Sequence, residues 1–595
     1  MHDDFLHYFE RELTFLREMG KEFALKYPKV AGRLLLEPGK CEDPHVERLI
    51  EAFALLCARV QRKIDDGFPE ITQSLLQVLY PQLTAPIPSL SVVKFAPLLG
   101  NLPACGHRIA RGTPLYSKPV NGIPCRFRTV YPVTIRPIEV VDARIEEPAK
   151  LFKGAQQMVR IRLRFHNGAD FNGFKGDGLR FYLNGPPQHV FPLYQLLLNH
   201  SCRVECVPAG VPTAAVPPLP PGCLRPVGFG ADEDLLPYPD QAFPGYRLLL
   251  EYFALPQKFL FFDCTGLSVL ETGAQRELSD LLFYLDRPVP ESLAIGPETF
   301  CLHATPVVNA FGMVAEPIRH DQRKTEYRVV PDLRREDGME VLSVDEVTAA
   351  AATSFSKVKR YRPVFSLRDG GEADENALWH LQRRPSSRRH DAGTEVFLSF
   401  RSFEGDAAVP KEETVLVRIT CSNRDLPAKL SCGDPSGDFE TETAAPLAAI
   451  HGLLKPTASL RPSRDGAQQR RLISHLSLNY LSLVEGGAGA LREILSLYDF
   501  CGSLTTRQQI NGIASVTSRP VTRRIGAGFC RGVEVTLQFD EEKYVGSGLY
   551  LFASVLERFL GAYVSVNSFV QMTASSTSGR VIKQWPPRNG DRALL

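Results

Sequence analysis

The stretch from Asp43 to Ser89 constrains the fold of this chain more than any other part of the sequence. It opens with Asp43-Pro44, a strong helix start, because the carboxylate accepts the first free N–H groups and proline has no N–H to satisfy. Apolar residues then recur at steps of three and four, which predicts an amphipathic helix with one apolar stripe. The stripe consists of Val46, Leu49, Ile50, Phe53, Leu56, Val60 and Ile64.

Signals for two further helices flank this one. Gly67 is placed to end the first helix, Pro69-Glu70 to open a short second helix, and Pro81 to stop it. Residues 3–27 predict an earlier helix, whose apolar face carries Leu6, Phe9, Leu13, Leu16 and Phe23. Three such helices bury only part of their apolar faces among themselves. We therefore expect the helical unit, residues 1–85, to pack on a partner or on the rest of the chain.

After residue 88 the sequence changes to short runs that predict β-strands separated by turns. The clearest is the alternating run from Val159 to Phe165. The chain of 595 residues is long enough for about three to five domains. A helix with apolar residues three and four apart returns near the end of the chain, where it carries Phe552, Val555, Leu556, Phe559, Leu560 and Tyr563. The predicted fold class is α+β and multidomain: an N-terminal helical unit, β-rich domains and a C-terminal α+β domain.

The domain limits follow from changes in composition. After the helical unit we predict a β-rich domain (86–206), a proline-rich linker (207–227) and a mixed β-rich domain (228–393) that ends in a charged loop at 369–393. A β-rich segment (394–471) and an α+β domain (472–595) follow. The polar run at 461–471 predicts a further loop.

Bulk composition excludes several classes of function. A net charge of +2 argues against a dedicated nucleic-acid or membrane-surface binder. The most apolar stretch, from Tyr246 to Phe262, is interrupted by Glu251, Pro256 and Lys258, so it is too short to span a membrane. The 13 cysteines are scattered and odd in number, which favours a reducing cytosol over a disulfide framework.

Only weak candidates for metal or phosphate chemistry are present. His200, Cys202, Cys206 and Cys223 supply the ligand types of a zinc site, but the spacing lacks two tight pairs and favours unliganded thiols. The glycine run 486–491 resembles a phosphate loop, but the position of its third glycine is Arg492, so a simple loop is favoured.

Candidates for acid–base or anion chemistry are equally weak. Cys264 with His303, beside Asp263, would suit a thiol nucleophile, yet core positions are favoured. The row Arg160, Arg162 and Arg164 could bind an anion or form a solvated strand face, and the solvated face is favoured. The paired carboxylates Asp65-Asp66 and Glu146-Glu147 fit a helix end and a loop. We predict no enzymatic activity, no cofactor and no metal.

Several blocks of the sequence resemble one family along nearly the whole chain. The most specific is DPHVERLIEAFALLCARVQRKIDDGFPEITQSLLQVLYPQ, and others include FERELTFLREMGKEFALKYPKVAGRL, PQKFLFFDCTGL, FCLHATPVVNAF and RGVEVTLQFDEEKYVGSGLYLFASVLERFLGAYVSVNSF. They resemble the TssF family (also called VasA or ImpG), baseplate subunits of the bacterial type VI secretion system. The match is weakest at 207–227 and 369–393.

The resemblance implies a structural, non-enzymatic role in a contractile injection machine. It implies the assembly of that family, in which two TssF copies embrace one TssG in a wedge, TssK joins through TssG, and wedges gather around the VgrG hub beneath the TssB–TssC sheath and the Hcp tube. It also implies a cytoplasmic location, docked at the inner membrane through the apparatus, and a fold similar to wedge proteins of contractile phage tails. A phage-tail-like protein outside secretion, or a metal-binding or enzymatic protein, stays as the alternative.

Two partner surfaces follow as hypotheses. Residues 5–80 would join a helical bundle with TssG and the second TssF copy through Leu49, Phe53, Leu56 and Val60. The C-terminal unit would make wedge-to-wedge contacts that include Phe552, Val555 and Phe559.

Overall fold

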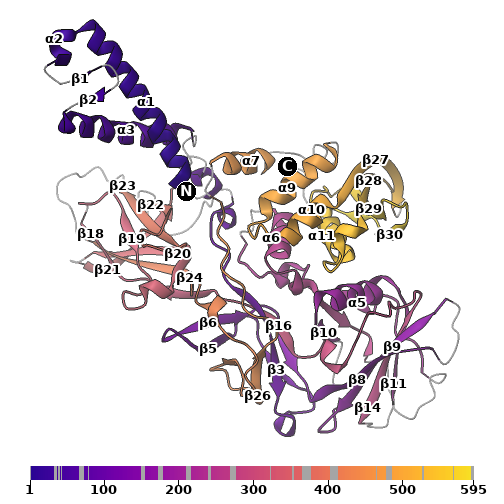
Figure 1. The fold of residues 1–595 in the computed structure, drawn as a ribbon. Helices are drawn as coiled ribbons and strands as arrows, with labels where there is room; N and C mark the ends of the chain where they lie inside the picture. Colours follow the sequence, from indigo (N-terminus) through magenta and orange to yellow (C-terminus); the bar gives the residue numbers. More distant parts are fainter. Residues whose placement is uncertain are drawn as a thin grey trace. The chain divides into compact units, whose positions relative to one another are not determined.

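The computed structural model describes most of the chain as two compact units, one made of residues 1–79 with 463–477 and the other of 80–462 with 478–595. Figure 1 shows the elements of both. The described residues are 2–32, 36–37, 40–41, 43–65, 73–77, 80–148, 154–169, 171, 178–208, 216–238, 243–267, 277–321, 323–351, 354–364, 377–402, 413–463, 466–476, 486–525, 528–566 and 568–590.

The first unit is mainly helical. It contains α1 (His2–Lys26), α2 (Pro28–Ala31), the strand pair β1 (Leu36–Glu37) and β2 (Lys40–Cys41), α3 (Pro44–Asp65), a helical turn at 73–77 and α7 (Gly466–Leu476). α1 packs along α3, and both helices predicted from the sequence are confirmed. Gly67, Pro69 and Glu70 lie outside the described residues.

The loop predicted at 461–471 is wrong from residue 466 onward. This part of the chain begins α7, which turns Gln469 and Leu472 inward, three residues apart. Polar residues on the remaining faces hid the short apolar pattern. The structure thereby joins a segment from late in the sequence to the N-terminal helices.

A closed six-stranded barrel organises the second unit. Its strands follow the order β16-β3-β26-β25-β5-β6, with β16 hydrogen-bonded to both β3 and β6. They are β3 (Leu90–Pro97), β5 (Pro114–Val120), β6 (Ile123–Thr129), β16 (Ala304–Val308), β25 (Phe439–Glu440) and β26 (Leu447–Gly452). Phe95, Leu115, Phe127, Phe439 and Ile450 fill the barrel, because alternate side chains of each strand point inward. A ribbon of β4 (His107–Ile109) and β7 (Val133–Ile135) adds to this core.

The chain leaves the barrel after β7 and returns to it at β16. Between them lie two four-stranded sheets, β11-β14-β9-β8 and β12-β13-β10-β15, with helices α5 (Pro187–Asn199) and α6 (Pro244–Ala254). The strands are β8 (Ile138–Glu146), β9 (Gln157–Phe165), β10 (Leu179–Leu183), β11 (Ser201–Pro208), β12 (Leu224–Pro226), β13 (Phe261–Cys264), β14 (Leu278–Leu285) and β15 (Phe300–Cys301).

The proline-rich segment predicted as a linker is partly built into this region. Residues 209–215 lie outside the described part. Beyond them Val216, Leu219 and Cys223 are buried, and β12 pairs with β13. The described residues of the segment therefore belong to a sheet and its packing, which corrects the linker prediction for them.

A second excursion from the barrel, between β16 and β25, forms an eight-stranded sheet. Its order is β17-β24-β20-β21-β22-β23-β19, and β18 also pairs with β24. The strands are β17 (Phe311–Val314), β18 (Ile318–His320), β19 (Tyr327–Val329), β20 (Glu340–Ala351), β21 (Ser354–Pro363), β22 (Ala377–Pro385), β23 (Thr394–Ser402) and β24 (Glu413–Ser422). Tyr327, Trp379, Leu398 and Val417 lie in its core.

The charged loop predicted at 369–393 is wrong for its central part, because Ala377–Pro385 forms β22. Trp379 and Leu381 point to the core while His380 and Gln382 are half-exposed, an alternation that the flanking charges concealed. Arg383 is buried and donates hydrogen bonds to the carbonyls of Val341 and Leu342. Since β22 pairs with β23, hydrogen bonds also cross the predicted domain limit at 393/394.

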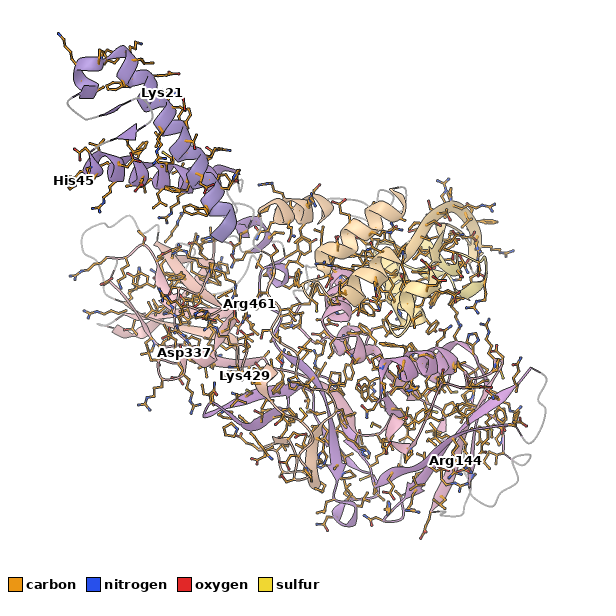
Figure 2. All side chains as sticks on the ribbon, viewed as in Figure 1. Lys21, His45, Arg144, Asp337, Lys429 and Arg461 are labelled. Atoms are coloured by element: carbon orange, nitrogen blue, oxygen red, sulfur yellow. The ribbon has the colours of Figure 1, made fainter. Side chains whose placement is uncertain are left out.

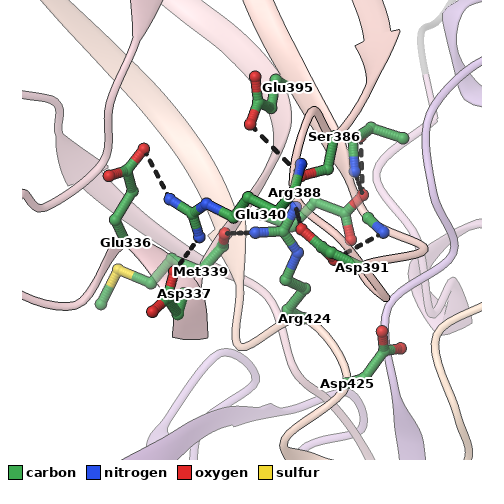
Figure 3. A network of polar contacts seen from close by, with 12 residues as sticks. Glu336, Asp337, Met339, Glu340, Ser386, Arg388, Asp391, Glu395, Arg424 and Asp425 are labelled. Carbon is green, nitrogen blue, oxygen red and sulfur yellow. Dashed lines mark hydrogen bonds and ion pairs between the residues drawn. The ribbon is translucent and has the colours of Figure 1, made fainter.

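Ion pairs connect the loops at one end of this sheet (Figure 3). Arg388 pairs with Glu336 at 2.9 Å and also with Asp337, while Arg424 pairs with Asp391 at 2.8 Å. Arg424 has a left-handed backbone (φ 55°), and Gly393 gives its guanidinium the room that a Cβ would occupy. Arg461, labelled in Figure 2, pairs with Glu340 at 2.8 Å and Asp425 at 3.0 Å, which ties the start of β20 to the chain after β26.

The C-terminal part is an α+β unit, as predicted. Its sheet has the order β27-β28-β29-β30 with β31 on β29, and α11 forms the crossover between the parallel strands β28 and β29. The elements are α9 (Gly487–Tyr498), α10 (Leu504–Asn511), β27 (Ile513–Ile525), β28 (Gly528–Phe539), α11 (Leu549–Ala562), β29 (Ser568–Ser576), β30 (Val581–Gln584) and β31 (Arg588–Asn589). α11 packs on α6 of the first excursion.

A reciprocal pair of buried asparagines joins the barrel to the eight-stranded sheet. Asn423 Oδ1 accepts hydrogen bonds from Asn309 Nδ2 and from the Arg126 backbone N–H, both at 2.8 Å. Asn309 Nδ2 also donates to the Arg126 carbonyl, and Asn309 Oδ1 accepts from the Asn423 backbone N–H. Both side chains are almost fully buried, so each group depends on the other.

We expect Asn423→Ala to lower the free energy of unfolding by about 2–3 kcal/mol, because it leaves buried donors without an acceptor. Urea denaturation measures the loss, and amide exchange at Arg126 should become faster. Asn101→Ala, at an exposed position, is the control and should change neither. Equal urea midpoints for the two variants would contradict this role of the asparagine pair.

Candidate interaction surface

The N-terminal helices present the strongest candidate surface. α3 begins as the sequence predicts: Asp43 Oδ1 accepts a hydrogen bond from the His45 backbone N–H at 2.9 Å, and Pro44 occupies the first helical position. Figure 2 labels His45 at this helix start. An ion pair between Arg17 of α1 and Glu47 of α3 links the two helices near this end.

α3 carries two apolar faces rather than one stripe. The inner face packs against α1 and uses small residues, since Ala54 and Ala58 are fully buried. The outer face carries the four larger residues predicted as contacts. Their exposed fractions are 69% for Leu49, 55% for Phe53, 58% for Leu56 and 59% for Val60.

These four side chains lie together because of their spacing. Steps of four, three and four residues keep them within a narrow sector of the helix, roughly 150° away from the Ala54 and Ala58 seam by the helical period. α1 adds exposed apolar residues of its own, Phe15 at 59% and Met19 at 48%, four residues apart. Large apolar side chains that stay exposed together on a folded protein make a candidate interaction surface. Sequence reasoning missed Phe15 and Met19, although their spacing was a usable signal.

The three residues predicted as contacts in the C-terminal unit are in the core instead. Phe552, Val555 and Phe559 of α11 are fully buried. The Phe552 ring lies 5.4 Å from Tyr252 of α6 and 5.9 Å from Tyr544, and the Phe559 ring lies 6.2 Å from Tyr246. The chain itself covers these side chains, so their assignment to a partner interface is corrected to the packing of α11 on α6.

Other large apolar side chains of the C-terminal part do face solvent. Phe529 at the start of β28, Val545 and Leu504 are 82%, 86% and 78% exposed. None of the three belongs to a run of apolar residues with the period of a helix or a strand. They were therefore not predicted.

The candidate zinc ligands do not come together as a site. His200 Nδ1 lies 3.0 Å from Asp286, and the Cys202 thiol donates to the Tyr284 carbonyl. Cys206 and Cys223 are buried, and burial raises the pKa of both thiols. Across the described ranges, no group of three or more His, Cys, Asp or Glu side chains could hold a metal ion.

The candidate nucleophile is equally inert. Burial raises the pKa of the Cys264 thiol well above its ordinary value, which disfavours the thiolate. Burial, with Lys94 and Arg136 nearby, lowers the pKa of His303 to about 3, and its Nε2 accepts a hydrogen bond from the Arg136 backbone N–H. Asp263 pairs with Arg180 through two bonds of 2.7 and 2.9 Å. These groups serve the packing, as the core interpretation predicts.

The remaining candidates are structural as well. Arg160 pairs with Asp142 and Glu146, Arg162 with Asp280, and Arg164 with Glu139, so the arginine row forms a cross-strand ion-pair ladder rather than an unpaired solvated face. Gly487, with φ of +71°, opens α9, and the strand-like run before it lies outside the described residues. Of the carboxylate pairs, Asp65 ends α3, Asp66 lies outside the described part, and Glu146 ends β8.

Within the described residues, no helix is long and apolar enough to cross a membrane. Tyr246–Phe262 instead contributes α6 and the start of β13. Lys258 and Glu251, two of the residues that interrupt its apolar run, form a fully buried ion pair. Burial lowers the pKa of Lys258 while Glu251 opposes the shift.

A multidomain α+β fold with an apolar helical face left open defines the class of an assembly protein. The model of the family "Type VI secretion system, TssF" matches residues 1–592. The type VI secretion system component TssF1 of Pseudomonas aeruginosa is 35% identical over 625 residues, and the match covers 100% of both chains. The chain belongs to the type VI secretion system TssF family, whose members are structural baseplate components and not enzymes.

Two solved structures resemble the fold. One is a cryo-electron-microscopy structure of the TssK-TssF-TssG baseplate subcomplex, with a TM-score of 0.76 and 27% identity, covering 92% of this chain and 99% of that one. The other is a baseplate complex from the type VI secretion system, with a TM-score of 0.63 and 24% identity, covering 99% and 100%. The second supports the fold alone.

Substitutions can test the difference in burial between the two sets of predicted contact residues. Phe552→Ala should lower the free energy of unfolding by about 3–5 kcal/mol, since it leaves a cavity between α11 and α6. Leu49→Ala should change it by less than about 0.5 kcal/mol in the isolated chain. Chemical denaturation of the two variants measures the contrast. A large loss for Leu49→Ala would show that α3 buries its outer face within its own chain.

Proposed function

We propose that this chain is a wedge subunit of the type VI secretion baseplate, and that the outer face of α3 is covered by partner helices. The partners are TssG and a second copy of this chain, with TssK joining through TssG. Four large apolar side chains exposed on one side of a helix carry this proposal. The similarity to the chain of a TssK-TssF-TssG subcomplex supports the choice of partners.

The energetics suit a permanent contact. Covering the remaining surface of Leu49, Phe53, Leu56 and Val60 contributes on the order of 4–7 kcal/mol, because each is a little over half exposed and full burial of one such side chain contributes about 1.5–3 kcal/mol. That is enough to change an affinity by about a thousandfold or more. Since α1 supports α3 through the Ala54 and Ala58 seam, the outer face is already formed before the partner binds.

The assembled wedges, on this proposal, surround the VgrG hub and support growth of the TssB–TssC sheath and the Hcp tube. The complex works in the cytoplasm, held at the inner membrane by the rest of the apparatus. This part of the proposal rests on membership in the family. The chain acts by shape and contact, without a cofactor.

A fourfold substitution tests the bundle. Changing Leu49, Phe53, Leu56 and Val60 together to Asp should abolish copurification with TssG, because charges replace the apolar contact. The matched control is Leu55→Asp, which changes a half-exposed leucine of the same helix that lies off this face, among Arg48, Glu51 and Arg59. The control should retain TssG.

Circular dichroism should show that both α3 variants keep their helices. Copurification of the folded fourfold variant with TssG would overturn the assignment of this face. Loss of TssG from both variants would also contradict it, because the effect would then not depend on the apolar face.

For wedge-to-wedge contact we propose the exposed side chains of the C-terminal part in place of the buried ones. Deleting this part would uncover α6, so a point change is the sharper test. Phe529→Asp should keep TssG binding and reduce assembly of sheaths in cells, observed by fluorescence microscopy. Thr522→Asp, at an exposed position of β27, should have no effect. Normal sheath numbers with Phe529→Asp would exclude Phe529 from this contact.

A further inference from the structure

The C-terminal sheet ends in an edge strand that is long and open. β27 runs over 13 residues and pairs with β28 on one side only (Figure 1). Its start is covered, because α9 packs on it and Arg492 donates hydrogen bonds to the Ile513 carbonyl. From residue 514 to residue 524 the described part of the chain gives the outer backbone edge no hydrogen-bond partner. An unpaired strand edge of this kind can accept a further strand.

Pro520 shows which backbone groups of β27 are free. Proline has no N–H, so inside a strand it is tolerated where its nitrogen points away from the ladder, and Pro520 lies opposite Val533 of β28. The backbone groups of every second residue point the same way. The N–H and C=O groups of Ser518, Thr522 and Arg524 therefore face the open edge, together with the Pro520 carbonyl. These four residues are exposed, so the edge offers both donors and acceptors to a partner.

The hairpin formed by β27 and β28 is strongly basic. Its two strands contain four arginines and one acidic residue, Glu534. Glu534 pairs with Arg523. Arg519, Arg524 and Arg531 are exposed and have no ion-pair or hydrogen-bond partner in the described part of the chain. An excess of three positive charges therefore remains on the hairpin.

This charge decides which kind of strand the edge can take. A second copy of β27 would bring its own arginines against Arg519 and Arg524, and like charges across a strand pair destabilise it. A nucleic acid or a lipid headgroup would neutralise the arginines, but neither can pair with the regularly spaced N–H and C=O groups of a strand. A peptide strand that carries carboxylates satisfies both the backbone and the arginines.

We propose that the outer edge of β27 binds an extended acidic segment of a partner protein, which adds to the sheet as a further strand. Main-chain hydrogen bonds form along residues 518–524. Alternate side chains of a strand point to opposite faces, so carboxylates of the segment pair with Arg519 on one face of the sheet and with Arg524 on the other. Arg531 is opposite Thr522 and supports the second face. The contact lies apart from the outer face of α3 and does not depend on TssG.

Binding of synthetic peptides to the full chain tests the proposal. The probe is a peptide of about eight residues with alternating Glu and Val, followed by fluorescence anisotropy. A second peptide with Pro in place of Val carries the same charge but lacks every second N–H. We expect saturable binding of the Glu-Val peptide that weakens with added salt, and binding of the Glu-Pro peptide that is weaker by about tenfold or more.

Three outcomes would overturn the proposal. The first is the absence of binding by the Glu-Val peptide, and the second is equal binding of the two peptides, which would show that the backbone edge is not used. The third is tighter binding of a single-stranded oligonucleotide, or of phosphatidylserine vesicles, than of the Glu-Val peptide.

Variants show whether the arginines and the backbone edge both contribute. Arg519→Glu together with Arg524→Glu should weaken binding of the Glu-Val peptide about tenfold or more, and this variant should bind a Lys-Val peptide instead, because the charge of the hairpin is reversed. Thr522→Pro keeps all the arginines but removes one outward N–H, and it should also weaken binding. Arg389→Glu, at an exposed position between β22 and β23, is the matched control and should bind like the parent chain.

Thermal melting should show that the variants stay folded. Parent affinity in the folded double arginine variant would overturn the assignment of the arginines. Parent affinity in folded Thr522→Pro would overturn strand addition. Loss of TssG binding by α3 variants is a separate measurement, so failure of this proposal and failure of the proposed function are distinguishable.

Discussion

Closure of the barrel is the constraint on which the second unit depends. Its six strands come from three separate parts of the chain, residues 90–129, 304–308 and 439–452. The ring closes only when all three are together, because β16 pairs with β3 and β6, while β26 pairs with β3 and β25 pairs with β5. Joining segments so distant in sequence carries a loop-closure cost and predicts slow folding of this unit. Once the barrel is closed, the ends of both excursions are held by its strands, and each excursion forms a long insertion between barrel strands.

Polar contacts fix how the eight-stranded sheet meets the barrel. Asn309 and Asn423 satisfy each other and the backbone of Arg126, while Arg461 bridges Glu340 and Asp425. Buried polar groups are costly unless all of them are paired, so a network of this kind permits one arrangement and penalises others. A subunit of a multi-protein baseplate benefits from such a junction, because the orientation of its parts is then defined before assembly.

α3 and α11 show how similar sequence patterns can have different functions. Both helices carry large apolar residues three and four apart. In α11 these residues meet the aromatic side chains of α6, such as Tyr252 and Tyr246, and become core. In α3 the small residues Ala54 and Ala58 contact α1, and the larger residues stay exposed. Interior packing therefore uses the small side of α3, which leaves the larger side exposed.

The sequence alone determined the fold class, the helix start at Asp43-Pro44, the strand from Val159 to Phe165 by its alternation, the membership in the TssF family and the apolar period of α3. Those features are local, because side-chain period and capping chemistry act within a few residues. It did not reveal β22, whose alternation was hidden by charges, or α7, whose buried face is only Gln469 and Leu472. Only the tertiary structure decided which strands close the barrel and that Phe552, Val555 and Phe559 are core. The physical reason is that periodicity shows which side chains share a face, whereas the segment that covers that face comes from a distant part of the chain.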